Sequence, residues 1–176
     1  MQMTNGRIFD LEILVFSDSH GRWENMREAM QRQVTRASKV FFLGDGLRDL
    51  DELGIDDAFL HAVRGNCDWF AEMLAPTETL VDVEGHTVLA THGHTFGVKG
   101  GLGALLSHAA EVGADVVLFG HTHAPLLETV PAGSVIGGNT LTRPIYLFNP
   151  GSIGYDGSFG TIVLKNREIL FSHGCL

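Results

Sequence analysis

Six short apolar runs, each ending in a polar cluster, constrain the fold of this chain most strongly. Short apolar runs bounded by turn residues are typical of buried β-strands. In an open α/β sheet, functional groups gather beyond the carboxyl ends of such strands. The clusters that follow the runs are Asp18-Ser19-His20, Gly44-Asp45, Gly65-Asn66-Cys67-Asp68, Thr91-His92-Gly93-His94, Gly120-His121-Thr122-His123 and Asn149-Pro150-Gly151-Ser152. We therefore expect acidic, amide and imidazole side chains to meet at one edge of the fold.

Length and composition indicate one globular domain over residues 1–176, with 44% apolar and 19% charged residues. No apolar run approaches the roughly 18 residues of a membrane span, so we expect no membrane association. The first twelve residues lack a basic segment followed by a long apolar stretch, as a signal peptide would have. We therefore expect a cytoplasmic protein.

The formal net charge of −9 disfavours stable nucleic-acid binding, which generally needs a basic surface. A small anionic substrate is still compatible with this charge, because bound divalent metals would dominate the local field. The two cysteines, Cys67 and Cys175, give no disulfide framework and are expected to be thiols.

The order of predicted elements favours an α/β fold with two β-sheets packed face to face and helices outside. A single mixed sheet is the alternative. The chain begins as βαβαβ and is expected to end in antiparallel strands. Strands are predicted over residues 11–17, 39–43, 59–64 and 115–119, helices over 22–36, 47–53 and up to Val112, a hairpin turning near Glu84-Gly85, and further strands after residue 125.

Two of the polar clusters have ligand types separated by one residue. In an extended segment, side chains two positions apart point to the same side, so Asp18 and His20 are expected to converge on one ion. His121 and His123 repeat this spacing near the other end of the chain. Both pairs therefore predict metal ligands.

Three further candidate ligands follow other predicted strands. Asp45 has two carboxylate oxygens that can join two ions, Asn66 offers an amide oxygen and His92 a further nitrogen. Oxygen and nitrogen donors without a thiolate suit manganese, iron, zinc, cobalt or nickel better than calcium or magnesium. Four imidazoles and three oxygen donors exceed the needs of one tetrahedral ion, so we expect two ions that share Asp45.

The ordered set of motifs resembles the calcineurin-like metallophosphoesterase superfamily from about residue 11 to the C-terminus. The short chain and the Gly65-Asn66-Cys67-Asp68 and Asn149-Pro150-Gly151-Ser152 motifs are similar to the small YfcE-like phosphodiesterases. The resemblance implies a four-layer αββα sandwich of two mixed β-sheets flanked by helices. It implies two divalent metal ions, with manganese favoured over nickel, iron, zinc and cobalt.

The resemblance also implies a division of the ligands. One ion would be held by Asp18, His20, Asp45 and His123. The other would be held by Asp45, Asn66, His92 and His121. His94 would then face the substrate rather than a metal.

The expected reaction is hydrolysis of a phosphodiester by a water or hydroxide that bridges the two ions. Larger relatives carry a histidine directly after the Gly-Asn pair as general acid, where this chain has Cys67. We expect Cys67 to be a small buried residue, and His94 and Asp68 are the other candidate proton donors. His94, which would position phosphate or donate a proton, and Asn66 are the predicted catalytic residues.

Two alternatives stay open. A phosphomonoesterase would use the same dinuclear centre, and a non-catalytic scaffold related to the retromer subunit would share the fold. Every ligand position is filled here, which disfavours the scaffold. The partner we expect is a small phosphoester, and a homo-oligomer is compatible with the β-rich C-terminal half.

Overall fold

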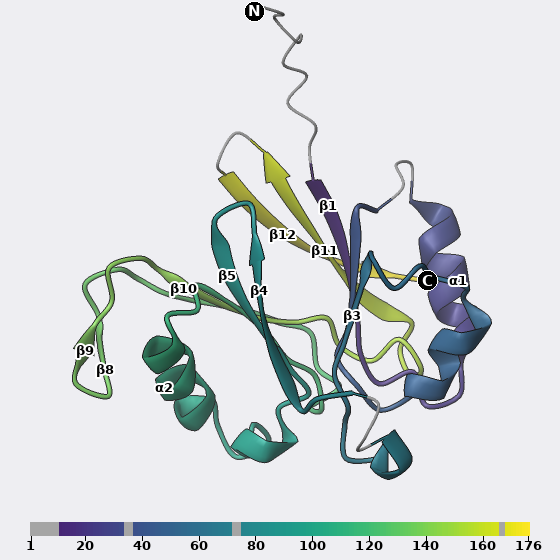
Figure 1. The fold of residues 1–176 in the computed structure, drawn as a ribbon, viewed down its shortest axis with the longest axis horizontal. Coiled ribbons are helices and arrows are strands. Elements are labelled where there is room, and N and C mark those ends of the chain that lie inside the picture. Colours follow the sequence, from purple (N-terminus) through teal and green to yellow (C-terminus); the bar gives the residue numbers. More distant parts are fainter. Residues whose placement is uncertain (1–10, 34–36, 72–74, 166–167) are drawn as a thin grey trace, which may run out of the picture.

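The first of two β-sheets contains the N-terminal and C-terminal strands of the protein (Figure 1). The computed structural model describes residues 11–33, 37–71, 75–165 and 168–176. The strands of this sheet are β1 (Leu11–Phe16), β2 (Lys39–Phe42), β3 (Leu60–Ala62), β11 (Ser158–Lys165) and β12 (Glu168–Cys175). Their order is β12-β11-β1-β2-β3, with β1, β2 and β3 parallel and β11 antiparallel to both of its neighbours.

The second sheet is built from the middle of the chain. Its strands are β4 (Glu78–Val83), β5 (His86–Thr91), β6 (Val116–Leu118), β7 (Leu126–Val130) and β10 (Ile145–Asn149), in the order β4-β5-β6-β10-β7. β5, β6 and β10 run parallel, whereas β4 and β7 are antiparallel to their neighbours. The short strands β8 (Val135–Ile136) and β9 (Asn139–Thr140) form a separate hairpin.

Alternation along β1 shows how the layers form. Ile13 and Val15 belong to the core between the two sheets, while Leu14 and Phe16 pack on the other face. That outer face is covered by α1 (Trp23–Arg32), through Met26 and other buried side chains.

The outer face of the second sheet is covered in the same way. The helix α2 (Gly103–Val112) packs Leu105 and Ala109 with Leu89 and Val117 of the sheet. Figure 1 shows α1 and α2 on opposite sides of the two sheets. The predicted αββα sandwich of two mixed sheets is therefore confirmed, and a single mixed sheet is wrong.

Most element predictions agree closely with the structure. The hairpin turns at Glu84 and Gly85, both with positive φ, as a two-residue turn between twisted strands requires. The predicted helix 22–36 ends earlier, at Arg32, and residues 34–36 lie outside the described residues. The helix predicted at 47–53 is the 3₁₀ helix η1 (Leu47–Glu52).

The prediction of an antiparallel C-terminal half needs one correction, because β10 pairs parallel with β6. Ile145, Leu147 and Phe148 are all buried, and burial on both faces is typical of an inner parallel strand. Residues 1–10, which the domain prediction includes, lie outside the described residues. Among the described helices, none combines the length and apolar character needed to cross a bilayer.

Candidate metal centre

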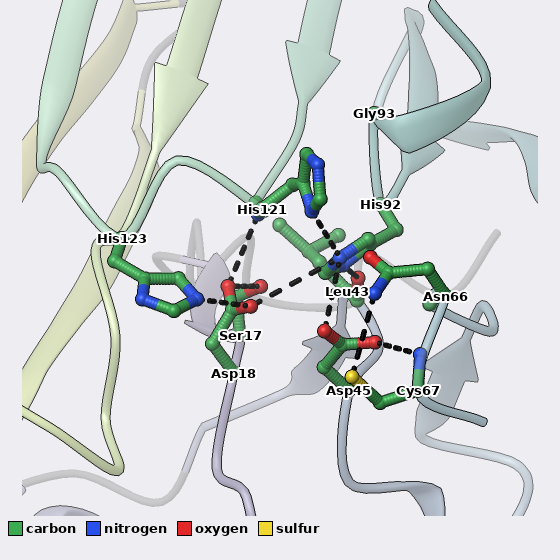
Figure 2. Close-up of polar contacts among 12 residues, drawn as sticks. Ser17, Asp18, Leu43, Asp45, Asn66, Cys67, His92, Gly93, His121 and His123 are labelled. Carbon is green, nitrogen blue, oxygen red and sulfur yellow. Dashed lines mark hydrogen bonds and ion pairs between the residues drawn. The ribbon is translucent and has the colours of Figure 1, made fainter. Parts of the chain in front are cut away.

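The predicted site residues occupy turns that follow the carboxyl ends of parallel strands. Figure 2 shows that the side chains of the labelled candidates point toward one another. Asp18 and His20 follow β1, Asp45 follows β2, Asn66 follows β3, His92 and His94 follow β5, and His121 and His123 follow β6. The two sheets therefore bring clusters that are up to about a hundred residues apart in the chain to one edge.

The first group of donor atoms comes from Asp18, His20 and His123, whose ligand atoms all lie within 4.8 Å of one another. Asp18 Oδ1 is 3.1 Å from His123 Nε2 and 3.7 Å from His20 Nε2. The other oxygen, Oδ2, accepts hydrogen bonds from Ser17 Oγ at 2.6 Å and from the His121 backbone N–H at 3.1 Å. These bonds fix the fully buried carboxylate and aim Oδ1 at the imidazoles.

Two atoms of this first group fit a metal ion well. Asp18 Oδ1 and His20 Nε2 are buried and make no hydrogen bond within the protein. Buried polar atoms are nearly always paired, since an unpaired one loses its solvation without compensation. A divalent cation between them would satisfy both, and the mixed oxygen and nitrogen donors suit a transition metal.

The second group comprises Asp45, His92 and His121. His92 Nε2 lies 3.4 Å from Asp45 Oδ2 and 3.1 Å from His121 Nδ1. His92 Nδ1 is 2.7 Å from the carbonyl oxygen of Leu43, to which it donates a hydrogen bond. This bond orients the buried imidazole with Nε2 toward the other donors, as metal-binding histidines require.

Asp45 connects the two groups. It also belongs to a third group with His20 and Cys67, so its carboxylate reaches donors on both sides. Asp18 Oδ1 is 4.0 Å from His92 Nε2, which places the first two groups next to each other. Cys67 was not predicted as a ligand, and its position shows that a thiol lies within reach of the donor set.

The backbone of the site corrects one step of the sequence argument. Asp18 and His20 have φ values of 56° and 46°, and His121 and His123 have 67° and 61°, so neither pair is extended. The side chains converge because both pairs lie in tight turns beyond the strand ends. Left-handed backbone at non-glycine residues is costly and concentrates at functional sites. The described ranges contain six non-glycine residues with positive φ. Five of them are predicted ligands: the four just named and Asp45.

Two glycines allow the loop of Asp45 to lie against the loop of Asn66. Gly44 has φ 96°, and a Cβ there would be 2.4 Å from the nitrogen of Gly65. A Cβ on Gly65 would in turn be 2.1 Å from Asp45 Oδ1. Any larger side chain at either position would push the two loops apart.

Asp68 holds the same two loops together. Its carboxylate, 2% exposed, accepts the backbone N–H groups of Asp45, Gly46, Leu47 and Gly65 at 2.7 to 3.0 Å. Because all of this acceptor capacity is used, Asp68 is a structural residue and not the proton donor considered from the sequence. The Gly65-Asn66-Cys67-Asp68 motif indicated that Asp68 lies near the site, but it did not indicate that Asp68 binds backbone N–H groups.

Asp49 supports the loop of His20 in a similar way, and no motif in the sequence indicated this role. Its carboxylate accepts hydrogen bonds from Ser19 Oγ at 2.5 Å and from the Gly21 N–H at 2.8 Å. Asp49 lies in η1, so the short helix after β2 supports the turn after β1.

Charge within the second group follows from burial and pairing. Burial acts to raise the pKa of Asp45, but the hydrogen bond and charge of His92 outweigh it, and the pKa falls below its ordinary value. Burial opposes protonation of His92, yet pairing with Asp45 raises the pKa of His92. Burial beside His92 lowers the pKa of His121 to about 4, so this imidazole is neutral at pH 7, the form that binds metal.

The remaining candidates lie around the two groups. Asn66 is exposed, and its Nδ2 is 3.4 Å from Cys67 Sγ. Cys67 is exposed, so the prediction that it is buried is wrong. Partial desolvation of the thiol by its surroundings and the nearby Asp45 raise the pKa of Cys67 to about 11. His94 lies in η3 (His94–Phe96) with its ring centroid 5.4 Å from that of His92. Burial and the charge of His92 lower the pKa of His94.

The match to a known family model decides where this arrangement belongs. Residues 11–174 match the model of the calcineurin-like phosphoesterase superfamily domain. The chain belongs to the calcineurin-like phosphoesterase superfamily. The resemblance inferred from the motifs is therefore confirmed over nearly the whole chain.

Curated members of the superfamily show the same relationship. The chain is 30% identical over 143 residues to the probable metallophosphoesterase YsnB of Bacillus subtilis, covering 81% of this chain and 75% of YsnB. It is 32% identical over 113 residues to the phosphodiesterase YfcE of Escherichia coli K12, covering 57% of this chain and 50% of YfcE. The alignment thus spans three quarters of one relative and half of the other.

Solved structures of other proteins have a similar fold. A predicted phosphoesterase of Streptococcus pneumoniae superposes with a TM-score of 0.68 and 25% identity, covering 94% of this chain and 89% of that protein. Vps29 of Entamoeba histolytica, solved with Zn²⁺, has a TM-score of 0.61 and 18% identity, covering 93% of this chain and 98% of that protein. The Vps29 likeness shows the fold alone.

Proposed function

We propose that this calcineurin-like phosphoesterase is a metal-dependent phosphodiesterase with two divalent ions, manganese first among the candidates. The observation that carries the proposal is the adjacency of two groups of oxygen and nitrogen donors, connected by Asp45 of the second group, which also lies close to His20 of the first. Membership of the phosphoesterase superfamily and the similarity to a protein named as a phosphodiesterase support this choice.

The proposed division of the ligands between the ions follows the two groups, with Asp45 added to the first set and Asn66 to the second. The first ion would be held by Asp18, His20, Asp45 and His123, and the second by Asp45, Asn66, His92 and His121. Asp45 would serve both, because its carboxylate is placed among donors of each group. The amide of Asn66 would complete the second set from the loop that Asp68 fixes.

When bound, two such ions lower the pKa of a water molecule for attack on phosphorus and offset charge on the phosphoryl oxygens. The chain supplies the geometry for this chemistry. Asp18 and Asp45 bring negative charge that selects cations, and both are buried, so their interaction with a cation is weakly screened. The hydrogen bonds to Asp18 Oδ2 and His92 Nδ1 keep the donor atoms pointing inward.

His94 is proposed to position the phosphoryl group or to donate a proton to the leaving group. Its Nδ1 is buried and has no hydrogen-bond partner, and its ring lies beside His92 and His121. An unpaired ring nitrogen next to the metal ligands is well placed to contact a substrate oxygen. Replacement of His94 by alanine should lower diester turnover, and full retained activity would remove it from the site.

We also propose that residues 1–176 form a single domain of a cytoplasmic protein. The proposed substrate is a small phosphoester rather than nucleic acid or a membrane lipid. The net charge of −9 supports this, since counterion-driven nucleic-acid binding needs a basic surface. Self-association through the sheet edges is compatible with this proposal.

The test compares bis(p-nitrophenyl) phosphate with p-nitrophenyl phosphate, using manganese-loaded protein and Asp45→Asn as control. Turnover of the diester, preferred over the monoester and lost in Asp45→Asn, would support the phosphodiesterase. Preference for the monoester would make the chain a phosphomonoesterase with the same centre. Turnover of neither compound, with metal bound, would favour the scaffold.

A further inference from the structure

Tyr155 places an aromatic ring directly against the first group of donors. Its ring centroid is 5.0 Å from that of His123, with the planes 27° apart, and 5.2 Å from that of His20. The side chain is nevertheless 67% exposed. With two imidazoles against the ring and two thirds of the residue exposed, much of the tyrosine surface is open to solvent beside the proposed metal centre.

The segment before Tyr155 is bound tightly to the loop of Asp18. Ser152 Oγ donates to the carbonyl oxygen of Asp18 at 2.8 Å, and the Gly154 N–H donates to the same oxygen at 3.1 Å. A Cβ on Gly154 would be 2.3 Å from the carbonyl oxygen of Ser19, so only glycine permits this approach. Ser152 Oγ also accepts the N–H of Tyr155 at 3.1 Å.

These contacts hold the backbone of Tyr155 against the loop of Asp18, and the ring contacts with His123 and His20 orient its exposed side chain beside the proposed metal ligands. An exposed ring adds little to the stability of the fold, because it buries little apolar area. A ring that is fixed in advance can instead stack on a planar group with little loss of conformational freedom. The ring centroids of His123 and Tyr155 are only 5.0 Å apart. An ester substituent on a phosphoryl group held beside His123 would therefore be within reach of Tyr155.

We propose that Tyr155 determines substrate specificity by stacking on a planar ester group of the phosphodiester, an aryl group or a nucleobase. This inference rests on the proposed phosphodiesterase function. A stacking platform is indifferent to which planar ring it meets, so it selects a chemical class and not one compound.

The kinetic test uses two diesters that release the same leaving group. Bis(p-nitrophenyl) phosphate and methyl p-nitrophenyl phosphate both release p-nitrophenolate and differ in the ester group that is retained. The specificity ratio is kcat/KM for bis(p-nitrophenyl) phosphate divided by kcat/KM for methyl p-nitrophenyl phosphate. We expect Tyr155→Leu to lower this ratio by about tenfold. Tyr155→Phe should keep the ratio, because the ring and not the hydroxyl stacks. Phe59→Leu, an exposed aromatic at the amino end of β3, is the matched control and should leave the ratio unchanged.

If Tyr155→Leu lowers both kcat/KM values equally, the ring merely organises His20 and His123, and the inference is overturned. An unchanged ratio with unchanged rates overturns it as well.

A binding measurement separates this inference from the proposed function. Calorimetry would give the dissociation constants of phenylphosphonate and methylphosphonate for manganese-loaded wild type and Tyr155→Leu. If the wild type binds phenylphosphonate more strongly than methylphosphonate and Tyr155→Leu loses this preference, the stacking role of Tyr155 is supported. This holds even if neither diester is hydrolysed, because absence of hydrolysis would contradict only the proposed phosphodiesterase function. Equal binding of the two phosphonates by the wild type overturns the platform even if the diester is hydrolysed.

Discussion

The buried carboxylate of Asp68 accepts the backbone N–H of Asp45 at 2.7 Å, so one acidic residue fixes the position of another. In Asp68→Asn, one acceptor oxygen becomes a donor, and two backbone N–H groups lose their partner. We expect the free energy of unfolding to fall by about 3 kcal/mol, because each buried unpaired group is costly. Manganese affinity should fall about tenfold or more, since the ligand loses its support.

Denaturant unfolding and calorimetric titration with manganese would measure the two effects of Asp68→Asn. Asp51→Asn is the control, because Asp51 is exposed and the substitution removes the same charge. Lower stability with unchanged manganese affinity would show that Asp68 supports the fold without positioning Asp45.

Gly65 offers a steric test of the same loop contact. In Gly65→Ala, the added Cβ would lie 2.1 Å from Asp45 Oδ1 and 2.7 Å from the Asp45 nitrogen, so the loops must separate. We expect a loss of about 2 kcal/mol in the free energy of unfolding and weaker manganese binding. Gly103→Ala at the start of α2 has open space and should be neutral or slightly stabilising. Wild-type manganese affinity in Gly65→Ala would contradict the tight contact.

His61 should make stability depend on pH. Its ring stacks on Phe41 with centroids 4.8 Å apart, and its buried Nε2 has no hydrogen-bond partner. Burial and the nearby charge of Lys39 lower the pKa of His61 in the folded state. Unfolding therefore takes up a proton, so stability present above about pH 6.5 is lost as pH falls below that value.

The variant His61→Phe keeps the stacked ring and removes the titration. The free energy of unfolding of the variant, minus that of the wild type, should be larger at pH 5 than at pH 8, as measured by urea unfolding at both values. The same difference at both pH values would show that His61 does not titrate differently in the folded protein.

The two histidines of the Gly120-His121-Thr122-His123 motif should affect different ions. His123 faces Asp18 in the first group, whereas His121 faces His92 in the second. We expect His121→Ala and His123→Ala each to weaken one of two binding events by about tenfold or more, and not the same one. Manganese calorimetry would show this as loss of a different step in each variant. Loss of the same step in both would contradict the division of the ligands.

Much of the fold could be predicted because its signals are local. Apolar runs marked the strands, the clusters after them marked the functional edge, and Glu84-Gly85 marked a hairpin turn. The partners of distant strands were not local. Nothing in the run at residues 158–165 indicates that it pairs with β1, because that pairing depends on which faces remain uncovered after the rest has folded.

The site could be predicted by residue type and less well by geometry. The side chains of Asp18 and His20 do approach each other, but through left-handed turns that no spacing rule reveals. Hydrogen bonding within the fold decides the roles of Asp49 and Asp68, and the sequence shows only that they are acidic.

Electron paramagnetic resonance of the manganese-loaded protein tests the central claim most directly. Two manganese ions that share a carboxylate about 3.5–4 Å apart are exchange-coupled, and their spectrum differs from that of isolated ions. We predict a coupled spectrum at about two ions per chain in the wild type and its loss in Asp45→Asn. A spectrum of isolated manganese ions at every loading of the wild type would contradict the shared centre.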